Sequence, residues 1–304
     1  MNRKASIVLC SYNMQRELPR TIRSLSPTMQ RGVQESDYEI VVIDNGSTEP
    51  FSETDCRRWV TDLRVITIAS PSPSPARAVN HGIAEAGSDL IGVLIDGARL
   101  VSPGIISTAL QASKLCDRVV ILTLGFHLGP KVQMESILEG YNKEQEDQLL
   151  AKSRWMEDGY RLFDISVFSG SSKNGWFSPM SESNAIFMRR ELWKEMGGFD
   201  ERFQTPGGGF VNLDTLLRAV QLPKVTVVTL LGEGTFHQVH GGVATNSSQD
   251  VIAVFHAEYK AIRGWIFQAP FYRSCYFGSV PDNALASIKS SAEMTSQRHA
   301  QKQP

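Results

Sequence analysis

The stretch Val93-Leu-Ile-Asp-Gly-Ala-Arg-Leu-Val-Ser-Pro-Gly104 takes an apolar run directly into an aspartate and then into a turn. A carboxylate at the carboxyl end of a strand is where α/β proteins hold a metal ion or a ribose. Metal sites of this kind often carry a second carboxylate two residues later, and here that position is Ala98. Asp96 therefore has two interpretations: one half of a metal site, or the cap of the helix that follows.

Short apolar runs and helical patterns alternate on both sides of this stretch. Strands are predicted over 5–10, 38–43, 64–69, 90–95, 118–123, 184–188 and 224–231. Helices are predicted over 17–25, 76–86, 103–116, 134–155, 190–196 and 212–221. The strands of the first half are fully apolar, which is typical of a parallel sheet covered by helices on both faces.

Three polar residues stand where predicted strands end, namely Ser11, Asp44 and Asp96. In an open α/β sheet, ligands bind outside the carboxyl ends of the strands. The three side chains are therefore expected on one rim of the sheet. That rim is the first indication of a functional site.

The bulk composition is that of an ordinary globular protein. The 304 residues carry a net charge of −1, and 41% of them are hydrophobic. Such a charge gives no reason to expect a nucleic-acid partner. The length suits one large α/β domain or two small ones.

The cysteines and the apolar runs indicate a cellular compartment. Four cysteines, at 10, 56, 116 and 275, form no CxxC pair, which favours free thiols in a reducing compartment. The apolar run near the N-terminus is too short for a secretion signal, and a cytoplasmic location is expected. No stretch approaches 18 apolar residues, so no spanning helix is expected, whereas peripheral membrane contact stays open.

Several motifs, in a fixed order, resemble those of family 2 glycosyltransferases. In the first half they are Ile7-Val-Leu-Cys-Ser-Tyr-Asn13, Val41-Val-Ile-Asp-Asn-Gly-Ser47, Ala76-Arg-Ala-Val-Asn-His-Gly82 and Leu94-Ile-Asp96. Downstream they are Asn184-Ala-Ile-Phe-Met-Arg-Arg190, Gly197-Gly-Phe-Asp-Glu201 and the triple glycine at 207–209. Their joint order and spacing carry the resemblance, which covers roughly residues 5–245.

The resemblance implies the GT-A fold, a Rossmann-like mixed α/β sheet sandwiched by helices, with an acceptor-side subregion. On this division residues 1–124 are the nucleotide-binding half of one catalytic domain, and residues 125–245 are its acceptor half. Residues 246–304 then form a C-terminal helical extension. The polar composition of 287–304 predicts a partly disordered tail.

The resemblance also implies which residues bind the donor. Ser11 and Tyr12 correspond to the family's contact to the nucleotide, and Asp44 corresponds to the acid that hydrogen-bonds the base, usually uracil. Taken alone, Asp44 before Asn-Gly-Ser is equally a turn former. Arg77 and Asn80 correspond to the segment beside the nucleotide and diphosphate, although a lone arginine is more often a solvated helix charge.

Asp96 corresponds to the first acid of the family's Asp-x-Asp motif, which faces the ribose and the metal-bound diphosphate. Ala98 offers no oxygen at the second position, but Mn²⁺ or Mg²⁺ keeps waters and phosphate oxygens as ligands, so one carboxylate can suffice. Arg99 is the alternative source of positive charge. Many GT-A enzymes place a histidine ligand after the last strong strand, and there we expect His240 first and His237 second.

A catalytic base is expected after the glycine loop, where the family often has Glu-Asp-x-Asp-Leu-x-x-Arg. The aligned stretch is Val211-Asn-Leu-Asp-Thr-Leu-Leu-Arg218. It puts Asn212 at the usual base position, and an amide cannot take a proton from a hydroxyl. Asp214 is the nearest carboxylate, and it is equally interpreted as a helix ion pair with Arg218. Asp200 is a further acid nearby.

The acceptor side carries no motif. Glu182 precedes the predicted strand at 184–188, where this family approaches the donor sugar and the acceptor, and it is an additional candidate acid. Trp176 could stack on a sugar face or pack in the core. Core packing is the safer expectation for the tryptophan.

The resemblance implies transfer of a sugar from a nucleotide-diphosphate donor, more often UDP-linked, to an acceptor hydroxyl, with inversion and a divalent metal. A saccharide, a lipid-linked and a protein acceptor are equally compatible. Ala98 and Asn212 also support a non-catalytic relative that binds a nucleotide sugar. A sugar nucleotidyltransferase is disfavoured because the loop after the first strand has no glycine, and a dinucleotide oxidoreductase because no G-x-G-x-x-G follows that strand.

Overall fold

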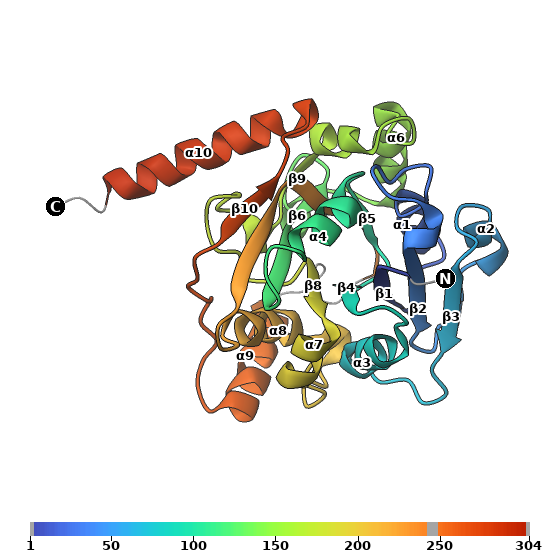
Figure 1. Cartoon of the computed structure of the whole chain (residues 1–304), viewed down its shortest axis with the longest axis horizontal. Coiled ribbons are helices and arrows are strands. Elements are labelled where there is room, and N and C mark those ends of the chain that lie inside the picture. Colours follow the sequence, from blue (N-terminus) through green and yellow to red (C-terminus); the bar gives the residue numbers. More distant parts are fainter. Residues whose placement is uncertain (1–2, 242–248, 302–304) are drawn as a thin grey trace.

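The computed structural model describes residues 3–241 and 249–301, and within these ranges the strands form one ten-stranded mixed sheet (Figure 1). The strands are β1 (Ala5–Ser11), β2 (Tyr38–Asp44), β3 (Leu63–Thr67), β4 (Leu90–Leu94), β5 (Arg99–Val101), β6 (Val119–Leu128), β7 (Ser166–Phe168), β8 (Ala185–Arg189), β9 (Thr226–His237) and β10 (Cys275–Gly278). The main order is β10-β9-β6-β8-β4-β1-β2-β3, while β5 pairs with β9 and β7 pairs with β6.

Strand β1 lies between two parallel neighbours and carries apolar side chains on both faces. β1 pairs in parallel with β2 and with β4, and each of its residues is buried. Val8 and Cys10 belong to one hydrophobic core, and Ile7 and Leu9 belong to the other. A strand that is apolar on both faces needs a cover on each, as the apolar runs of the sequence predict.

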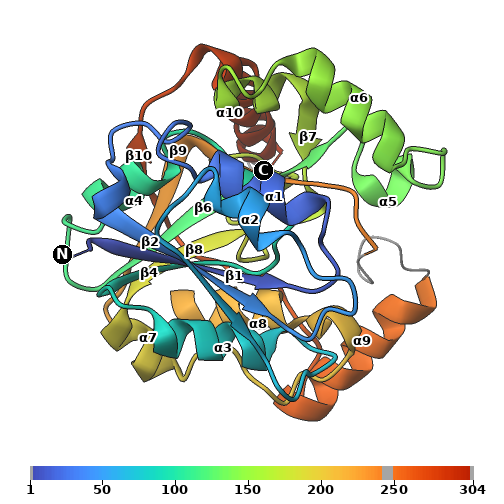
Figure 2. The same cartoon turned by 90° about the vertical axis from the view of Figure 1, so that its right-hand side faces the viewer.

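Helices cover both faces of the sheet (Figure 2). They are α1 (Glu17–Ser24), α2 (Glu53–Arg57), α3 (Ala76–Glu85), α4 (Ile105–Ala112), α5 (Gln133–Ser136), α6 (Lys143–Ser153), α7 (Arg190–Met196), α8 (Val211–Val220), α9 (Gln249–Arg263) and α10 (Leu285–Ala300). The helices α1, α2 and α4 contribute to one core, and α3, α7 and α8 contribute to the other. The sheet is thus the middle of three layers, and its strand ends form the rim that carries the site.

The sheet is mixed, because β8 runs antiparallel to both of its neighbours, β4 and β6. The apolar pattern of the first half predicts only the parallel part, whereas the GT-A resemblance implies a mixed sheet. The sequence pattern does not predict β5, β7 or β10, and each of these strands has only three or four residues. So short a run shows no periodicity, and it becomes a strand only through its partner.

The C-terminal part differs from its prediction in two ways. It is not only helical, since β10 joins the sheet beside β9. Residues 287–300, for which partial disorder is predicted, belong to α10, which Figure 1 shows reaching away from the sheet. The predicted boundary after residue 245 lies outside the described residues. Within the described part of the chain, no helix combines the length and the apolar character needed to cross a bilayer.

A buried carboxylate on β9 ties the sheet to two neighbouring segments. Glu233 is 2% exposed. Its carboxylate accepts hydrogen bonds from Ser102 Oγ at 2.5 Å, Gly104 N at 3.1 Å and Tyr160 Oη at 2.7 Å. Ser102 and Gly104 precede α4, and Tyr160 belongs to the 3-10 helix at Gly159–Ile165. Burial raises the pKa of Glu233 to about 7, although the hydrogen bonds favour its charged form.

The folded protein should lose stability as the pH rises above about 4.3, the pKa of an ordinary glutamate. The loss should continue up to about 7, the raised pKa of Glu233. In that window the folded state keeps a proton that the unfolded state has released, so the free energy of unfolding falls by about 1 to 3 kcal/mol. Glu233→Gln keeps the shape and cannot ionise, so it should flatten this dependence. Urea unfolding of the wild type and of Glu233→Gln at about pH 5 and about pH 8 measures the difference. An equal change in unfolding free energy in the two proteins would contradict the prediction.

Candidate functional site

Asp96 lies just past the end of β4, in a turn that its own side chain helps to close. Its Oδ1 accepts a hydrogen bond from the Ala98 N–H at 3.0 Å, and its Oδ2 accepts one from Arg99 Nε at 2.9 Å. The contact with Ala98 closes the turn, and the contact with Arg99 is an ion pair. Asp96 is not the cap of the following helix, because β5 comes next and Gly104 stands at the N-cap of α4, so its role in a metal site is the interpretation that stays a prediction.

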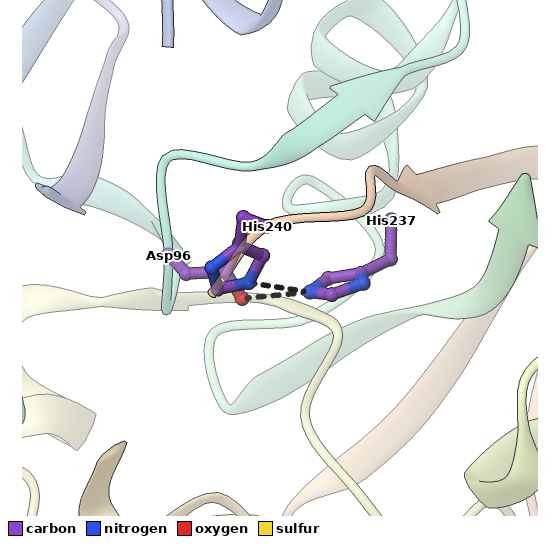
Figure 3. A group of neighbouring side chains, drawn as sticks. All are labelled: Asp96, His237 and His240. Carbon is purple, nitrogen blue, oxygen red and sulfur yellow. Dashed lines mark hydrogen bonds and ion pairs between the residues drawn. The ribbon is translucent and has the colours of Figure 1, made fainter. Parts of the chain in front are cut away.

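The pairing of β5 with β9 brings two histidines to this turn. In that antiparallel ladder Arg99 lies opposite His237, the last residue of β9. The pairing extends one hydrogen bond further, since the Gln238 N–H donates to the Ala98 carbonyl at 2.9 Å. His240 follows two residues later, and its ring lies beside that of His237 (Figure 3).

Asp96, His237 and His240 form a cluster, called here the Asp/His cluster (Figure 3). One candidate ligand atom from each residue lies within 4.8 Å of the others. The His237 Nε2 atom is 3.1 Å from His240 Nε2 and 3.9 Å from Asp96 Oδ2. The three residues that the sequence predicts as metal ligands thus converge on one point.

Gln133, on α5, sets the tautomer of His237. Its Nε2 donates to the His237 carbonyl at 2.9 Å, which turns the amide oxygen toward His237 Nδ1 at 2.6 Å. The Nδ1 atom then carries the proton, so Nε2 presents its lone pair to the cluster. Sequence reasoning missed Gln133, because its contact depends on where α5 lies and no motif marks it.

The electrostatics of the cluster suit a cation. Burial lowers the pKa of His240, and it lowers the pKa of His237 well below the ordinary value, so both imidazoles are neutral at neutral pH. Burial opposes ionisation of Asp96, but Arg99 and the two histidines hold its pKa below the usual range. The two Nε2 atoms lie 3.1 Å apart, close enough for a hydrogen bond between the rings or for both to bind one cation. One carboxylate and two neutral imidazoles fit a divalent ion.

Arg99 links the Asp/His cluster to a second carboxylate. Its Nη1 donates to Asn184 Oδ1 at 3.2 Å, and its Nη2 lies 3.7 Å from Glu182 Oε1. Arg99 is 7% exposed, so its charge acts at short range in a poorly solvated place. The predicted alternative source of positive charge therefore lies inside the site.

Glu182 lies between Arg99 and Asn212. The Asn212 Nδ2 donates to Glu182 Oε1 at 3.2 Å, while Asn212 Oδ1 accepts from Ser183 Oγ at 3.2 Å. The Glu182 side chain is 24% exposed, so a ligand can reach it. Asn212, at the expected position of the base, thus contacts a carboxylate that sequence spacing alone did not connect to it.

Asp214 and Asp200, the other two predicted catalytic acids, lie in a network of ion pairs. Asp214 is fully buried. Its Oδ2 accepts from Arg218 Nε at 2.7 Å, and Arg263 donates to both of its oxygens at 2.6 Å. Asp200 pairs with Arg202 at 2.6 Å and with Arg263 at 2.8 Å. Of the two interpretations of Asp214, this geometry favours the ion pair, because guanidinium groups already hold both oxygens.

The donor side of the rim is formed by the ends of β1 and β2. Ser11 lies opposite Asp44 in the parallel ladder, and both side chains are buried. The Asp44 Oδ1 atom accepts from the Ser47 N–H at 2.9 Å, so Asp44 does close a turn. Burial raises the pKa of the Cys10 thiol to about 12, and the charges of Asp96 and Asp44 add to the shift. Because β2 and β4 flank β1, Asp44 and Asp96 lie at the ends of the strands on either side of Ser11.

Three further predicted donor residues surround this rim. Tyr12 is 53% exposed and is open to a ligand. Arg77 and Asn80 line a cavity of about 510 Å³ beside the end of β3. Asn80 is also a tether, since its Nδ2 donates to the Phe199 carbonyl at 2.9 Å and its Oδ1 accepts the Phe199 N–H at 2.8 Å. Gly198 has a φ of +67°, and a Cβ there would lie 2.4 Å from Asn80 Oδ1, so this tether requires glycine.

Trp176 belongs to the core, which corrects its prediction as an acceptor residue. It is fully buried, and its Nε1 donates to the Leu230 carbonyl at 3.0 Å. Its ring contacts those of Phe126 and Phe163, with centroid distances of 5.6 and 6.0 Å. A ring covered in this way presents no face to a sugar. The alternative expectation, core packing, is the one that the structure supports.

The sequence matches the model of a known family, described as Glycosyl transferase family 2, over residues 6–169, more than half of the chain. Two curated relatives are validoxylamine A glucosyltransferases of Streptomyces hygroscopicus, one from subsp. limoneus and one from subsp. jinggangensis (strain 5008). Each is 25% identical over 228 residues, which is 72% of this chain. The chain spans about half the length of these relatives, 48% of the first and 52% of the second.

Solved structures of TarS from S. aureus share the fold. TarS 1–349 matches with a TM-score of 0.52 and 14% identity, covering 84% of this chain and 65% of that chain. The same TarS segment in complex with UDP-GlcNAc matches with a TM-score of 0.50 and 15% identity, covering 84% and 66%. At this identity the likeness concerns the fold alone, and it confirms the GT-A fold that the sequence motifs implied.

Asp214→Asn should destabilise the fold and leave the chemistry of the folded protein intact. The change removes the buried carboxylate that pairs with Arg218 and, beside Asp200, with Arg263, at a cost of about 3 kcal/mol. Thermal unfolding measures the loss, and a transfer assay on the fraction that stays folded measures the chemistry. A variant with wild-type stability and no activity would return Asp214 to the role of base.

Proposed function

The chain belongs to glycosyl transferase family 2, and we propose that it is a glycosyltransferase that moves a sugar from a nucleotide-diphosphate donor to an acceptor hydroxyl. The Asp/His cluster carries this proposal, because its ligand atoms lie within 4.8 Å of one another. It adjoins the rim formed by Ser11 and Asp44 at the ends of paired strands. Ligands of α/β sheets bind at such a rim.

A UDP-linked donor is the favoured substrate. TarS, which has the same fold, has been crystallised in complex with UDP and with UDP-GlcNAc. In this chain Asp44 offers a carboxylate that can accept a hydrogen bond from a uracil N–H. Tyr12 offers an exposed ring for stacking on a base, and Arg77 adds positive charge in the adjoining cavity.

Asp96, His240 and His237 are the proposed ligands of a divalent cation, Mn²⁺ or Mg²⁺. When bound, the ion would neutralise the charge that gathers on the departing diphosphate. Two imidazole ligands favour Mn²⁺, because Mg²⁺ prefers oxygen ligands in a near-ideal octahedron. In this arrangement His237 supplies a ligand in place of the acid that is missing at Ala98.

Glu182 is the proposed base, which takes the proton from the acceptor hydroxyl. It is partly exposed, it accepts a hydrogen bond from Asn212, and it lies 3.7 Å from Arg99. Attack of the hydroxyl on the anomeric carbon, from the side opposite the diphosphate, inverts that carbon. Asn212 then orients the base, which gives a physical reason for an amide at a position where the family often has an acid.

The second candidate is a protein that binds a nucleotide sugar without transferring it, which Ala98 and Asn212 support. A panel of nucleotide sugars, tested with Mn²⁺ and with EDTA, separates the two candidates when donor binding and slow donor hydrolysis are both followed. The acceptors in the panel are saccharides, lipid-linked sugars and proteins. Metal-dependent turnover supports the transferase, binding without turnover supports the second candidate, and no binding of any nucleotide would overturn both.

Asp96→Asn should weaken metal-dependent donor binding by about 10- to 100-fold. The change removes the carboxylate of the Asp/His cluster and the closest anionic partner of Arg99. Calorimetric titration of UDP-sugar with and without Mn²⁺ measures the effect. Asp89→Asn, on an exposed aspartate that pairs with Arg189, is the control and should bind normally. Unchanged donor binding by Asp96→Asn would refute its role.

Glu182→Gln should lower kcat by about 10²- to 10⁴-fold, the range typical of a lost general base. Donor binding should stay near that of the wild type, because the amide keeps the contact with Asn212. Single-turnover transfer and donor titration together separate the two effects. Glu85→Gln, on an exposed glutamate that pairs with Arg64, is the matched control. Full activity of Glu182→Gln would assign the base elsewhere.

A further inference from the structure

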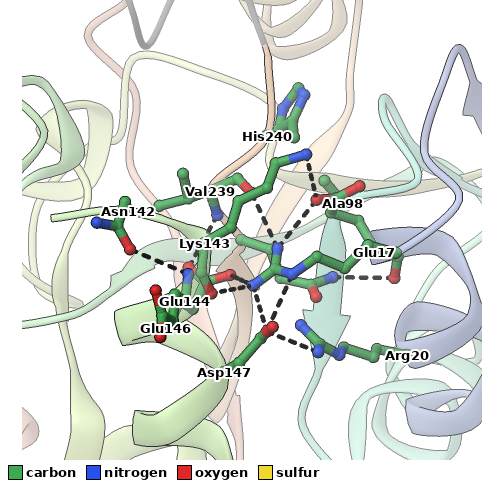
Figure 4. A network of polar contacts seen from close by, with 12 residues as sticks. Glu17, Arg20, Ala98, Asn142, Lys143, Glu144, Glu146, Asp147, Val239 and His240 are labelled. Atoms are coloured by element: carbon green, nitrogen blue, oxygen red, sulfur yellow. Dashed lines mark hydrogen bonds and ion pairs between the residues drawn. The ribbon is translucent and has the colours of Figure 1, made fainter.

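The backbone of Val239 is held on both sides by charged side chains (Figure 4). Its N–H donates to Glu146 Oε2 at 2.8 Å, and its carbonyl accepts from Arg16 Nη1 at 3.1 Å. The two side chains also contact each other, since Arg16 Nη2 donates to Glu146 Oε1 at 3.0 Å. These three contacts, called here the Arg16–Glu146 clamp, enclose the residue that directly precedes His240.

Val239, which the clamp holds, lies just beyond the paired end of β9. β9 ends at His237, and the pairing with the β5 side reaches as far as the bond between Gln238 and Ala98. Val239 is the next residue and is 7% exposed, so its backbone groups need partners other than a strand. A carboxylate and a guanidinium take that place, and each makes one hydrogen bond to the backbone.

Further contacts hold the side chains of Arg16 and Glu146 in place. The Glu146 side chain is 0% exposed and lies in the first turn of α6, where the helix dipole favours a negative charge. Burial raises the pKa of Glu146, while the Val239 N–H and Arg16 favour its charged form. Arg16 also donates to Glu17, to the Lys143 carbonyl and to Asp147. Figure 4 shows Glu146 and Asp147 below Val239, with His240 above it.

We propose that Arg16 and Glu146 are positioning residues of the metal site, which fix the backbone at Val239 so that the His240 imidazole faces His237. This inference rests on the proposed function of the Asp/His cluster. His237 has its own supports, namely the ladder with β5 and the hydrogen bond to Gln133. His240 lies beyond that ladder, so its distance from His237 depends on the residue before it. The clamp therefore couples α6 to the metal site.

Glu146→Ala removes the acceptor of the Val239 N–H, and Asp147→Asn is its matched control. Asp147 is the next carboxylate on α6 and also accepts hydrogen bonds from Arg16, but its contacts in the described chain are with arginines and not with Val239. Mn²⁺ binding to the full chain, without donor, is measured from the electron paramagnetic resonance of the free ion. We expect about 10- to 100-fold weaker binding for Glu146→Ala and wild-type binding for Asp147→Asn.

Glu146→Gln keeps the test decisive if Glu146→Ala does not fold. Gln retains an oxygen for the Val239 N–H, but a neutral amide oxygen accepts more weakly than a carboxylate, so its Mn²⁺ affinity should fall between those of the wild type and Glu146→Ala. Wild-type affinity in the folded Glu146 variants would overturn the clamp and leave the proposed function standing. An equal loss in Asp147→Asn would also overturn it, because the effect would belong to the whole arginine network. Absence of Mn²⁺ binding by the wild type would instead refute the metal site itself.

Discussion

The antiparallel pairing of β5 with the end of β9 is the constraint on which the site depends. One edge of β9 serves two partners in turn, β10 over Val228–Leu231 and β5 over Thr235–His237, while β6 holds the other edge. A strand as short as β5 has little stability of its own, and Glu233 reinforces it by binding Ser102, the residue that follows it. Because β5 begins three residues after Asp96, its register with β9 decides that Asp96 meets His237 and not another side chain of that strand.

The charge of the site is balanced by residues that come from different elements. Asp96 has a permanent cation in Arg99, and the two histidines beside it are held neutral by burial. Arg99 in turn reaches Glu182, so the carboxylates of Asp96 and Glu182 share one guanidinium. A cation entering the Asp/His cluster would add positive charge next to Arg99. Such a site therefore favours ligands that bring negative charge with the metal, as a diphosphate does.

The sequence predicts the parallel strands and the rim well, because these depend on apolar runs and on where such runs end. Asp96, Ser11 and Asp44 follow from that rule. The two histidines required the family resemblance, since their meeting with Asp96 depends on the register of β5, which has no pattern of its own. Spacing along a helix revealed Arg218 as a partner of Asp214 but could not reveal Arg263, which approaches from α9. Trp176 was ambiguous for a similar reason, because an aromatic side chain suits a core and a sugar site equally.

The number of cations that already hold each acid determines which of them is able to take a proton. Two arginines contact Asp214 and two contact Asp200, so protonating either would discard strong ion pairs. Glu182 has a neutral amide at 3.2 Å and an arginine only at 3.7 Å. An acid in place of Asn212 would put two carboxylates in contact there and raise the pKa of one of them. The amide at 212 and the carboxylate at 182 are therefore best understood together: an amide at 212 leaves a single carboxylate beside Arg99, and we propose that this carboxylate, Glu182, is the base.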